Sequence, residues 1–272
     1  MINAQTKTPD FTAIKTKQKA AWGAGDYAAV GATLQIVAEN LCEAMDLRAG
    51  SSLLDVAAGN GACALAAARR FCDVTASDYV PALLEKADAR AKAEGLPINT
   101  VEADVEALPF DDASFDYVTS TFGVMFAPDQ MTAAQEMLRV VKPGGKIGLT
   151  NWTPDSFIGR LFKVIGAHVA PPAGINPPAL WGTNEHLDIL FNASTKVTTE
   201  RRTFNWRYRS PEHWVEEWKA VYGPVQKAFA ACEDAGKASL EAGLYDLIDD
   251  MNLAGDGTMI VPSAYLEVIV IR

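Results

Sequence analysis

A repeated alternation of strand-like and helix-like segments constrains the fold of this chain more than any other feature. Short apolar stretches typical of strands occur at 51–57, 74–77, 98–103, 115–121 and 146–152. Segments of helical composition separate them: an alanine-rich one that runs to about Arg70, and two more at 81–94 and 129–141. Strands that alternate with helices of this length pair in parallel and carry helices on both faces of the sheet. The pattern therefore predicts an α/β fold.

The two ends of the chain break this rhythm. Apolar residues recur at helical spacing from Asp26 to Asp46, so we expect a helix there, preceded by a polar arm that is lid-like or partly frayed. Beyond residue 152 we expect a helix at 184–191, a strand at 195–209, a helical region at 211–250 and a final strand at 258–271. The last strand should pair antiparallel with the 195–209 strand, which completes a seven-stranded sheet.

These boundaries divide the 272 residues into three parts. Residues 1–46 form an N-terminal arm and lid helix. Residues 47–152 form the ligand-binding core. Residues 153–272 supply helical cap segments and the last two strands. We expect the segments 153–192 and 210–256 to cover the carboxyl ends of the strands.

Charge and composition exclude several classes of protein. With 34 acidic against 24 basic residues the formal net charge is −10, which argues against a nucleic-acid partner. No apolar run approaches the roughly 18 residues of a membrane span, and the N-terminus lacks the apolar segment of a signal peptide. Four cysteines without a CxxC motif and three histidines disfavour a metal site or a disulfide framework. The sequence thus predicts a cytoplasmic protein that binds no metal.

A glycine-containing loop ends the first strand of the alternation. Glycines at Gly59 and Gly61 allow a tight turn and a close approach of the backbone to a ligand, and the helix that follows presents free N–H groups. The segment Gly59-Asn60-Gly61-Ala62-Cys63-Ala64 also fits the dinucleotide-binding pattern with alanine in the last place. NAD binding is therefore one alternative.

Acidic residues at three strands favour a different ligand. Asp55 lies within the glycine-loop strand, Asp78 ends the second strand, 19 residues after Gly59, and Asp104 follows the third. In open α/β sheets, ligands bind in the crevice at the carboxyl ends of the strands. A ring of carboxylates there suits a nucleoside that carries a positive charge and an amine. It suits a pyrophosphate poorly.

Four ordered motifs over residues 20–152 resemble those of class I S-adenosylmethionine (SAM)-dependent methyltransferases, and the chain is similar to the ubiquinone/menaquinone-biosynthesis (UbiE-like, methyltransferase type 11) subgroup. The motifs are Asp55-x-Ala57-x-Gly59-x-Gly61, Asp78, Asp104 with Leu108-Pro109-Phe110 and Phe115-Asp116, and Leu138-Arg139 with Lys142-Pro143-Gly144-Gly145. The resemblance implies a Rossmann-like seven-stranded sheet, helices on both of its faces, a helical cap, and SAM as cofactor with S-adenosylhomocysteine as product. Ala57 stands where the family more often has glycine, a mild change that we expect to alter the loop slightly and to retain binding.

The resemblance also implies roles for individual residues. The backbone at Ala57, Gly59 and Gly61 approaches the methionine part of the cofactor, and Asp55 orients this loop or the methionine amine. The nucleoside end involves Asp78 on the ribose, Tyr79 packed on adenine, Asp104 accepting from the adenine amino group, and Val105 lining the ring. The sulfonium side is faced by Thr121 and Phe122, and the N-terminal arm that covers the cofactor carries Trp22 and Tyr27.

The acceptor end of the reaction is less determined by the sequence. The candidates for a general base are His168, His186, His213, Glu185 and Tyr27, and none of them is assigned as catalytic. Trp152, Phe157, Phe162 and Trp181 line an apolar acceptor pocket on one interpretation and form the core of the cap on the other. We predict a methyltransferase that acts on oxygen, carbon or nitrogen of a small, largely apolar or aromatic acceptor. The alternatives are an NAD-dependent oxidoreductase and a non-catalytic SAM-binding scaffold, and the oligomeric state is left open.

Overall fold

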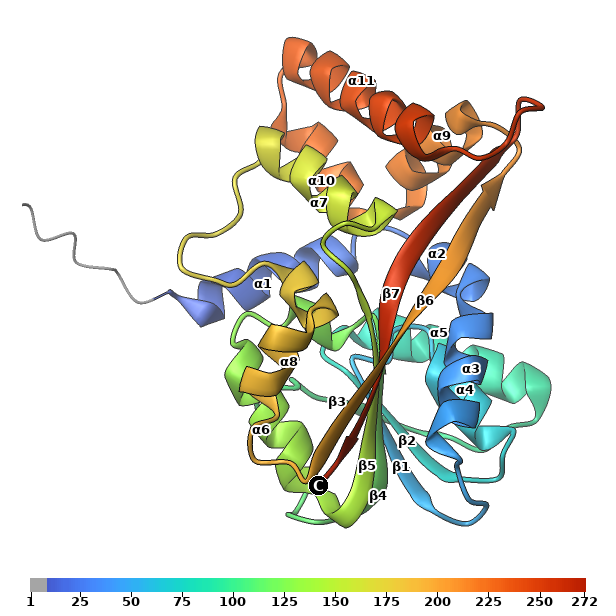
Figure 1. Cartoon of the computed structure of the whole chain (residues 1–272), viewed down its shortest axis with the longest axis vertical. Coiled ribbons are helices and arrows are strands. Elements are labelled where there is room, and N and C mark those ends of the chain that lie inside the picture. The colour runs from blue at the N-terminus through green and yellow to red at the C-terminus, as the bar shows by residue number, and fades with distance from the viewer. Residues whose placement is uncertain (1–8) are drawn as a thin grey trace, which may run out of the picture.

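A computed structural model describes residues 9–272 and shows a twisted seven-stranded sheet with helices on both faces (Figure 1). The strands are β1 (Ser52–Val56), β2 (Asp73–Asp78), β3 (Asn99–Glu102), β4 (Phe115–Thr121), β5 (Val141–Trp152), β6 (Lys196–Tyr208) and β7 (Met259–Ile271). Their order is β3-β2-β1-β4-β5-β7-β6. The first five pair in parallel, and β7 pairs antiparallel with both β5 and β6. The predicted α/β fold and the antiparallel return of the last strand are confirmed.

Three helices cover one face of the sheet and two cover the other. The first group is α3 (Gln35–Met45), α4 (Ala62–Ala68) and α5 (Pro81–Glu94), and the second is α6 (Gln130–Val140) and α8 (Asn184–Leu190) (Figure 1). All seven residues of α4, ACALAAA, are buried. Alanine side chains are short enough for α4 to pack closely against both α3 and the sheet, which explains why a helix this small can be completely enclosed.

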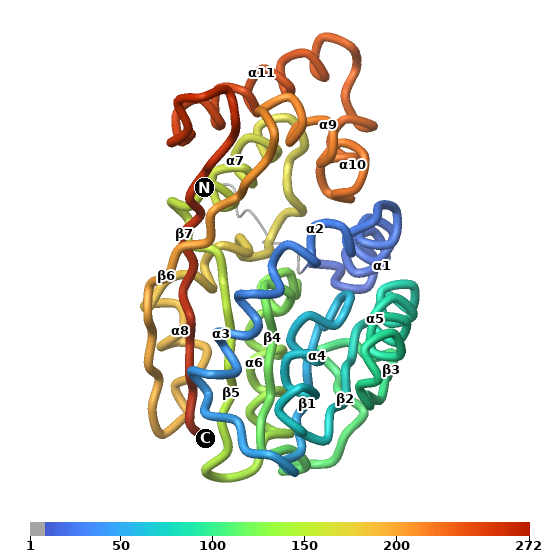
Figure 2. Tube along the Cα trace, turned by 90° about the vertical axis from the view of Figure 1, so that its right-hand side faces the viewer, coloured from blue at the N-terminus to red at the C-terminus, as the bar shows by residue number. Residues whose placement is uncertain are grey.

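A second layer of helices lies above the carboxyl ends of the strands. It consists of α7 (Phe157–His168), α9 (Pro211–Val221), α10 (Gly223–Ala231) and α11 (Asp234–Met251). Figure 2 shows α1 (Phe11–Trp22) and α2 (Tyr27–Thr33) between this layer and the sheet. The short 3-10 helix η2 (Pro178–Gly182) and α8 pack instead beside β5, β6 and α6. The expected cap segment 153–192 is therefore only partly a cap, because its second half covers the sheet face.

The structure corrects the predicted arm and two predicted helical segments. Residues 11–22 form a regular helix, whose N-terminus is capped by the Asp10 carboxylate accepting from the N–H of Ala13. The expected helix over 26–46 is broken at Leu34, whose φ of −89° and ψ of 4° end α2 and begin α3. The helical region 211–250 divides into three helices, with breaks at Tyr222 and at 232–233. The part of the predicted arm at 1–8 lies outside the described residues.

Candidate functional site

A pocket opens at the carboxyl ends of β1, β2 and β4, beneath α1 and α2. It encloses about 960 Å³ of empty space, part of it open to solvent. We call it the strand-end pocket. Eleven of the twelve predicted binding residues line it: Trp22, Tyr27, Asp55, Ala57, Gly59, Asp78, Tyr79, Asp104, Val105, Thr121 and Phe122. The twelfth, Gly61, does not line the pocket and faces α5 instead. Residues spread over a hundred positions of sequence thus converge on one site.

The glycine loop adopts left-handed backbone conformations at three of its residues. The φ angles are +49° at Ala57, +56° at Gly59 and +80° at Gly61. Left-handed backbone places a Cβ close to the following carbonyl oxygen, at a cost of roughly 1–2 kcal/mol. Alanine at position 57 is therefore not the mild change expected from the sequence, because it strains the loop. The loop keeps this shape partly because Gly123 has no Cβ, which would lie 2.3 Å from the Ala57 carbonyl oxygen.

Gly61 offers a direct test of this loop geometry. A Cβ at this position would lie 2.9 Å from the Cβ of Ala87, whereas a Cβ at Gly95, with φ +67°, would meet nothing within 4 Å. We expect Gly95→Ala to lower the free energy of unfolding by about 1 kcal/mol, from backbone strain alone. Gly61→Ala should lower it by about 2–3 kcal/mol, since overpacking adds to the strain. Urea unfolding of both variants measures the difference, and equal losses would show that the contact with α5 is unimportant.

Two buried carboxylates hold the glycine loop in place. The Asp78 Oδ2 accepts from the Gly59 N–H at 2.9 Å and its Oδ1 from the Val80 N–H at 2.9 Å. The Asp55 Oδ2 accepts from the Ala64 N–H and its Oδ1 from the Thr119 hydroxyl, both at 3.0 Å. Burial raises the pKa of Asp55 to about 7 and also raises the pKa of Asp78. The charge of Asp78 raises the pKa of Asp55 further, so the site favours a ligand with positive charge.

A lysine that the sequence did not reveal closes the other end of the pocket. Lys15 of α1 places its Nζ 2.6 Å from Asp104 Oδ2 and also pairs with Glu106. Burial lowers the pKa of Lys15, but its hydrogen bonds to the two carboxylates outweigh that and leave it raised. The Lys15–Asp104 ion pair therefore connects α1 to the segment after β3 that lines the pocket. No sequence pattern signals Lys15, because only the packing of α1 brings it to β3.

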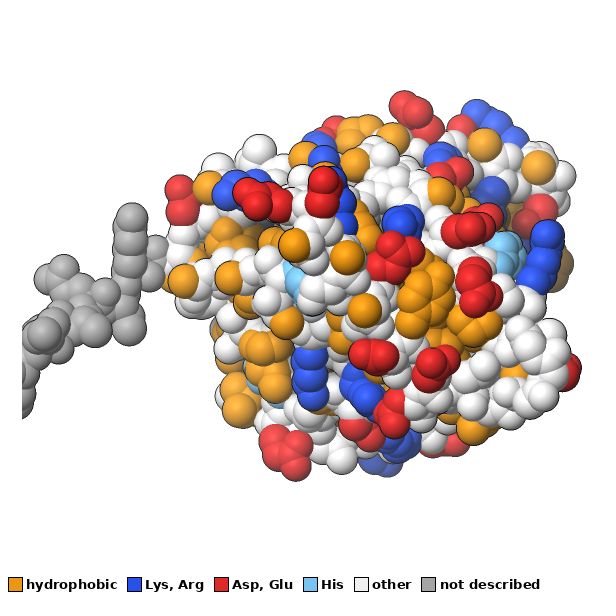
Figure 3. Space-filling model, turned by 90° about the horizontal axis from the view of Figure 1, so that it is seen from above, with side chains coloured by type: hydrophobic (Ala, Val, Ile, Leu, Met, Phe, Trp, Pro, Cys, Tyr) orange, Lys and Arg blue, Asp and Glu red, His pale blue; other side chains and the backbone are white. Residues whose placement is uncertain are grey.

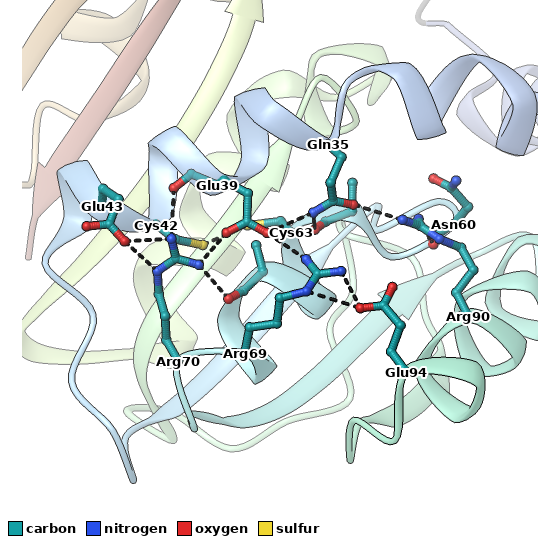
Figure 4. A network of polar contacts seen from close by, with 12 residues as sticks. Gln35, Glu39, Cys42, Glu43, Asn60, Cys63, Arg69, Arg70, Arg90 and Glu94 are labelled. Carbon is teal, nitrogen blue, oxygen red and sulfur yellow. Dashed lines mark hydrogen bonds and ion pairs between the residues drawn. The ribbon is translucent and has the colours of Figure 1, made fainter.

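A polar network behind the loop ties it to α3 and α5 (Figure 4). Arg90 of α5 donates from Nη1 to the Asn60 carbonyl at 2.7 Å and from Nη2 to Gln35 Oε1 at 2.8 Å. Gln35 in turn donates to the Ala62 carbonyl at 2.9 Å. The Asn60 side chain donates to the Ala28 carbonyl in α2 at 3.2 Å. The Asn60 side chain thus connects the loop to α2, and Arg90 and Gln35 hold the loop through its backbone carbonyls.

Aromatic side chains separate the strand-end pocket from a second cavity. This second cavity, the aromatic chamber, has about 290 Å³ of space between its lining atoms, part of it open to solvent. It is lined by Trp22, Tyr27, Val30, Leu34, Phe122, Phe126, Trp152, Ile158, Trp206, Trp218 and Tyr222. Five of these also line the strand-end pocket and form a shared wall: Trp22, Tyr27, Leu34, Phe122 and Phe126. None of the lining side chains carries a formal charge at neutral pH.

The shared wall is well packed. The Trp22 ring meets Tyr27 and Phe126 edge to face, with centroids 5.5 and 4.8 Å apart. Phe122 stacks on Trp152 at 3.9 Å with an angle of 2° between the rings. Beside it, the hydroxyl oxygen of Thr121 is buried and has no hydrogen-bond partner among residues 9–272. Thr121 is also one of the residues that line the strand-end pocket.

The structure separates the aromatic residues predicted after β5 into two groups. Trp152 lines the aromatic chamber, and Phe162 packs against Phe126 of the shared wall at 5.6 Å. Trp181 and Phe157 are fully buried, one against Phe191 and the other against Trp214. Trp181 therefore belongs to the core beneath α8, and it does not contribute to a binding pocket.

The histidine candidates lie away from both cavities. His186 Nε2 is 2.6 Å from Gln130 Oε1, His168 contacts the Val164 carbonyl, and His213 packs against Tyr208. Neither these residues nor Glu185 lines the strand-end pocket or the aromatic chamber. Of the base candidates, Tyr27 alone lines both cavities. Burial raises its pKa to about 12, so it remains a phenol at neutral pH.

Residues 9–272 offer neither a metal-binding cluster nor a helix that could span a membrane. No three or more His, Cys, Asp or Glu side chains gather there in a way that would hold a metal ion. Over the same residues, every helix falls short of the length and apolarity needed to cross a bilayer.

Comparisons with known proteins concern the family and the fold of the chain. Residues 54–149 match the methyltransferase domain family. An uncharacterized protein of Mycobacterium tuberculosis is 38% identical over 253 residues, which cover 90% of this chain and 92% of that protein. The demethylmenaquinone methyltransferase of Deinococcus radiodurans is 37% identical over 126 residues, 45% of this chain and 52% of that enzyme. The crystal structure of the YcgJ protein of Bacillus subtilis superimposes with a TM-score of 0.59 at 18% identity, covering 89% of this chain and 98% of that one, and supports the fold.

Proposed function

Because this chain belongs to the class I SAM-dependent methyltransferases, with UbiE-like enzymes among its relatives, we propose that it methylates a small, largely apolar or aromatic molecule bound in the aromatic chamber. The observation that carries this proposal is the shared wall. A cofactor in the strand-end pocket and an acceptor in the chamber would meet across Trp22, Tyr27 and Phe122. Methyl transfer is an in-line displacement that needs the two ligands in direct contact, so the side chains of the shared wall must part when both ligands are bound.

The strand-end pocket fits SAM in its chemistry. Asp55 and Asp78 offer buried negative charge to the methionine ammonium and hydrogen-bond acceptors to the ribose, and Asp104 can accept from the adenine amino group. The orphaned Thr121 hydroxyl lies near the shared wall. SAM supplies an electrophilic methyl group on a sulfonium. NAD is the poorer fit, because its pyrophosphate would face these same carboxylates across the glycine loop.

The chain's contribution to the reaction is mostly positional. Holding two reactants in line can account for roughly 7–11 kcal/mol of the barrier. Tyr27 lies in the shared wall but stays protonated because burial raises its pKa to about 12, so it would orient the acceptor by donating a hydrogen bond. We therefore expect an acceptor that needs no strong protein base.

Surface charge supports a small-molecule acceptor, and the free cysteines support a cytoplasmic location. Acidic and basic side chains are interspersed on the face above the strand ends (Figure 3), and the net charge is −10. Both favour a small molecule over a nucleic acid. Buried Cys42 and Cys63 are free thiols with sulfur atoms 3.9 Å apart, as expected in the reducing cytoplasm.

Ligand binding and turnover test the proposal together. S-adenosylhomocysteine should raise the melting temperature, because a ligand selective for the native state stabilises it by RT ln(1 + [L]/Kd). NAD at the same concentration should leave it unchanged. Mass spectrometry of reactions with SAM and a panel of phenols, quinols and amines should then detect a methylated small molecule. Stabilisation by NAD alone would favour an oxidoreductase. Binding of S-adenosylhomocysteine without methylation of any acceptor would favour a non-catalytic scaffold.

A further inference from the structure

We infer that Trp206 and Tyr222 determine acceptor specificity by donating hydrogen bonds to oxygen atoms of a neutral ring compound. The inference rests on the proposed function, because it concerns the acceptor that would occupy the aromatic chamber. Both residues lie beyond residues 54–149, where the family match ends. They are therefore features of this chain's own C-terminal part.

Trp206 lines the chamber and carries an unused hydrogen-bond donor. Its side chain is 1% exposed and lines the chamber, and its indole nitrogen has no partner among the described residues. Two other buried indoles, those of Trp181 and Trp214, are also unpartnered, but neither lines the chamber. The neighbouring Trp218 has already donated its N–H to the Tyr208 hydroxyl at 2.9 Å. An unsatisfied buried donor is unfavourable, and a ligand oxygen in the chamber would relieve it.

Tyr222 supplies a second donor. Its ring is 4% exposed, and its hydroxyl forms no hydrogen bond with any residue between 9 and 272. Burial raises the pKa of Tyr222, and the nearby Tyr27 raises it further. The group therefore stays a phenol that can donate its proton in a hydrogen bond at any physiological pH.

The two donors have different neighbours in the chamber. The Tyr222 ring is 5.8 Å from Trp22 and 6.4 Å from Tyr27, both in the shared wall. Trp206 instead packs against Trp152, with centroids 5.9 Å apart, and Trp152 stacks on Phe122 of the shared wall. Tyr222 and Trp206 would therefore contact different oxygen atoms of the acceptor.

The alternative occupant is a cation held by aromatic faces. Aromatic rings do attract quaternary ammonium groups, and the chamber is rich in them. However, no carboxylate lines it, and an indole N–H has no lone pair to receive an ammonium proton. A quaternary ammonium ion would leave the Trp206 donor as unsatisfied as it is now. The donors therefore favour carbonyl or hydroxyl oxygen.

Binding to the protein saturated with S-adenosylhomocysteine tests the inference without turnover. The probes are 4-hydroxyacetophenone, which has a phenol and a ketone, 4-ethylphenol, which lacks the ketone, and phenyltrimethylammonium. We expect the ketone to bind about tenfold more tightly than 4-ethylphenol in calorimetry, and both to bind more tightly than the cation. Trp206→Phe should reduce the ratio of the affinities for 4-hydroxyacetophenone and 4-ethylphenol to about one. Trp214→Phe, which also removes an unpartnered indole N–H, should leave this ratio unchanged. Tyr222→Phe should weaken both phenols several-fold and leave their ratio unchanged.

Nitrogen-15 spectra of the six indole N–H groups give a second readout. The signal that is lost in Trp206→Phe should shift on addition of 4-hydroxyacetophenone, and the signal lost in Trp214→Phe should not. Thermal unfolding and S-adenosylhomocysteine affinity establish that each variant is folded. The inference is overturned if the cation binds best, if Trp206→Phe keeps the ratio, or if no probe binds the loaded protein. Failure of S-adenosylhomocysteine itself to bind would instead overturn the proposed function.

Discussion

Replacement of Asp78 by alanine is expected to weaken S-adenosylhomocysteine binding by a factor of about 10² to 10⁴. Each Asp78 carboxylate oxygen already accepts one backbone N–H, from Gly59 or Val80. A carboxylate oxygen has room for a second donor, so both ribose hydroxyls can bind without displacing the loop. Hydrogen bonds to a charged group contribute about 1.5–3 kcal/mol each, and the substitution also leaves two loop N–H groups unpaired. Isothermal titration calorimetry measures the loss.

Asp111→Ala is the matched control for this experiment. Asp111 is exposed in the turn before β4, and none of its side-chain atoms bonds another described residue. Asp111→Ala removes one negative charge, as Asp78→Ala does, without touching the strand-end pocket. The affinity of this variant for S-adenosylhomocysteine should therefore equal that of the unmodified protein. Asp112 is less suitable, because it pairs with Arg139 at 2.8 Å. Equal affinities for the Asp78 and Asp111 variants would show that Asp78 does not bind the cofactor.

The affinity for S-adenosylhomocysteine should increase about tenfold between pH 6 and pH 8. Asp55 has a pKa of about 7 because it is buried, so it is largely protonated at pH 6 and largely ionised at pH 8. The ammonium of the ligand favours the ionised form. If only this form binds well, the apparent affinity follows its fraction, which is about one in eleven at pH 6. Calorimetry at a series of pH values should give a sigmoid centred near pH 7.

Asp55→Asn separates this titration from other effects of pH. Asparagine keeps the shape and one acceptor oxygen, but it cannot ionise, so the affinity should lose its pH dependence and stay low.

The stability of the unmodified protein should change in the opposite direction and fall as the pH rises. A carboxyl whose pKa is raised on folding stabilises the native state below its unfolded pKa near 4, and this contribution is lost as pH rises towards 7. The loss is about 4 kcal/mol for three pH units. A pH-independent affinity in the unmodified protein would contradict this role of Asp55.

Local patterns predicted most of the core. The boundaries of β4 and α5 agree with the structure residue for residue, because apolar alternation, an initial proline and a final glycine are local signals. Asp78 and Asp104 were found because the carboxyl ends of parallel strands meet at one edge of a sheet. The same reasoning failed for Lys15, since α1 belongs to no strand–helix alternation that would fix its place. It also failed for Trp181, because aromatic content alone does not distinguish a cavity wall from a packed core.

The sequence by itself determined the sheet, the glycine loop and the carboxylates around it, because each depends on the residues of one segment and on the fixed geometry of parallel strands. Only the tertiary structure decided how the loop is strained at Ala57, which lysine meets Asp104, and where a second cavity lies. Trp22, Phe122, Trp206 and Tyr222 are up to 200 residues apart in the chain. Their meeting depends on the packing of α1, α9 and β6 above the strand ends, and no local pattern encodes packing between distant segments.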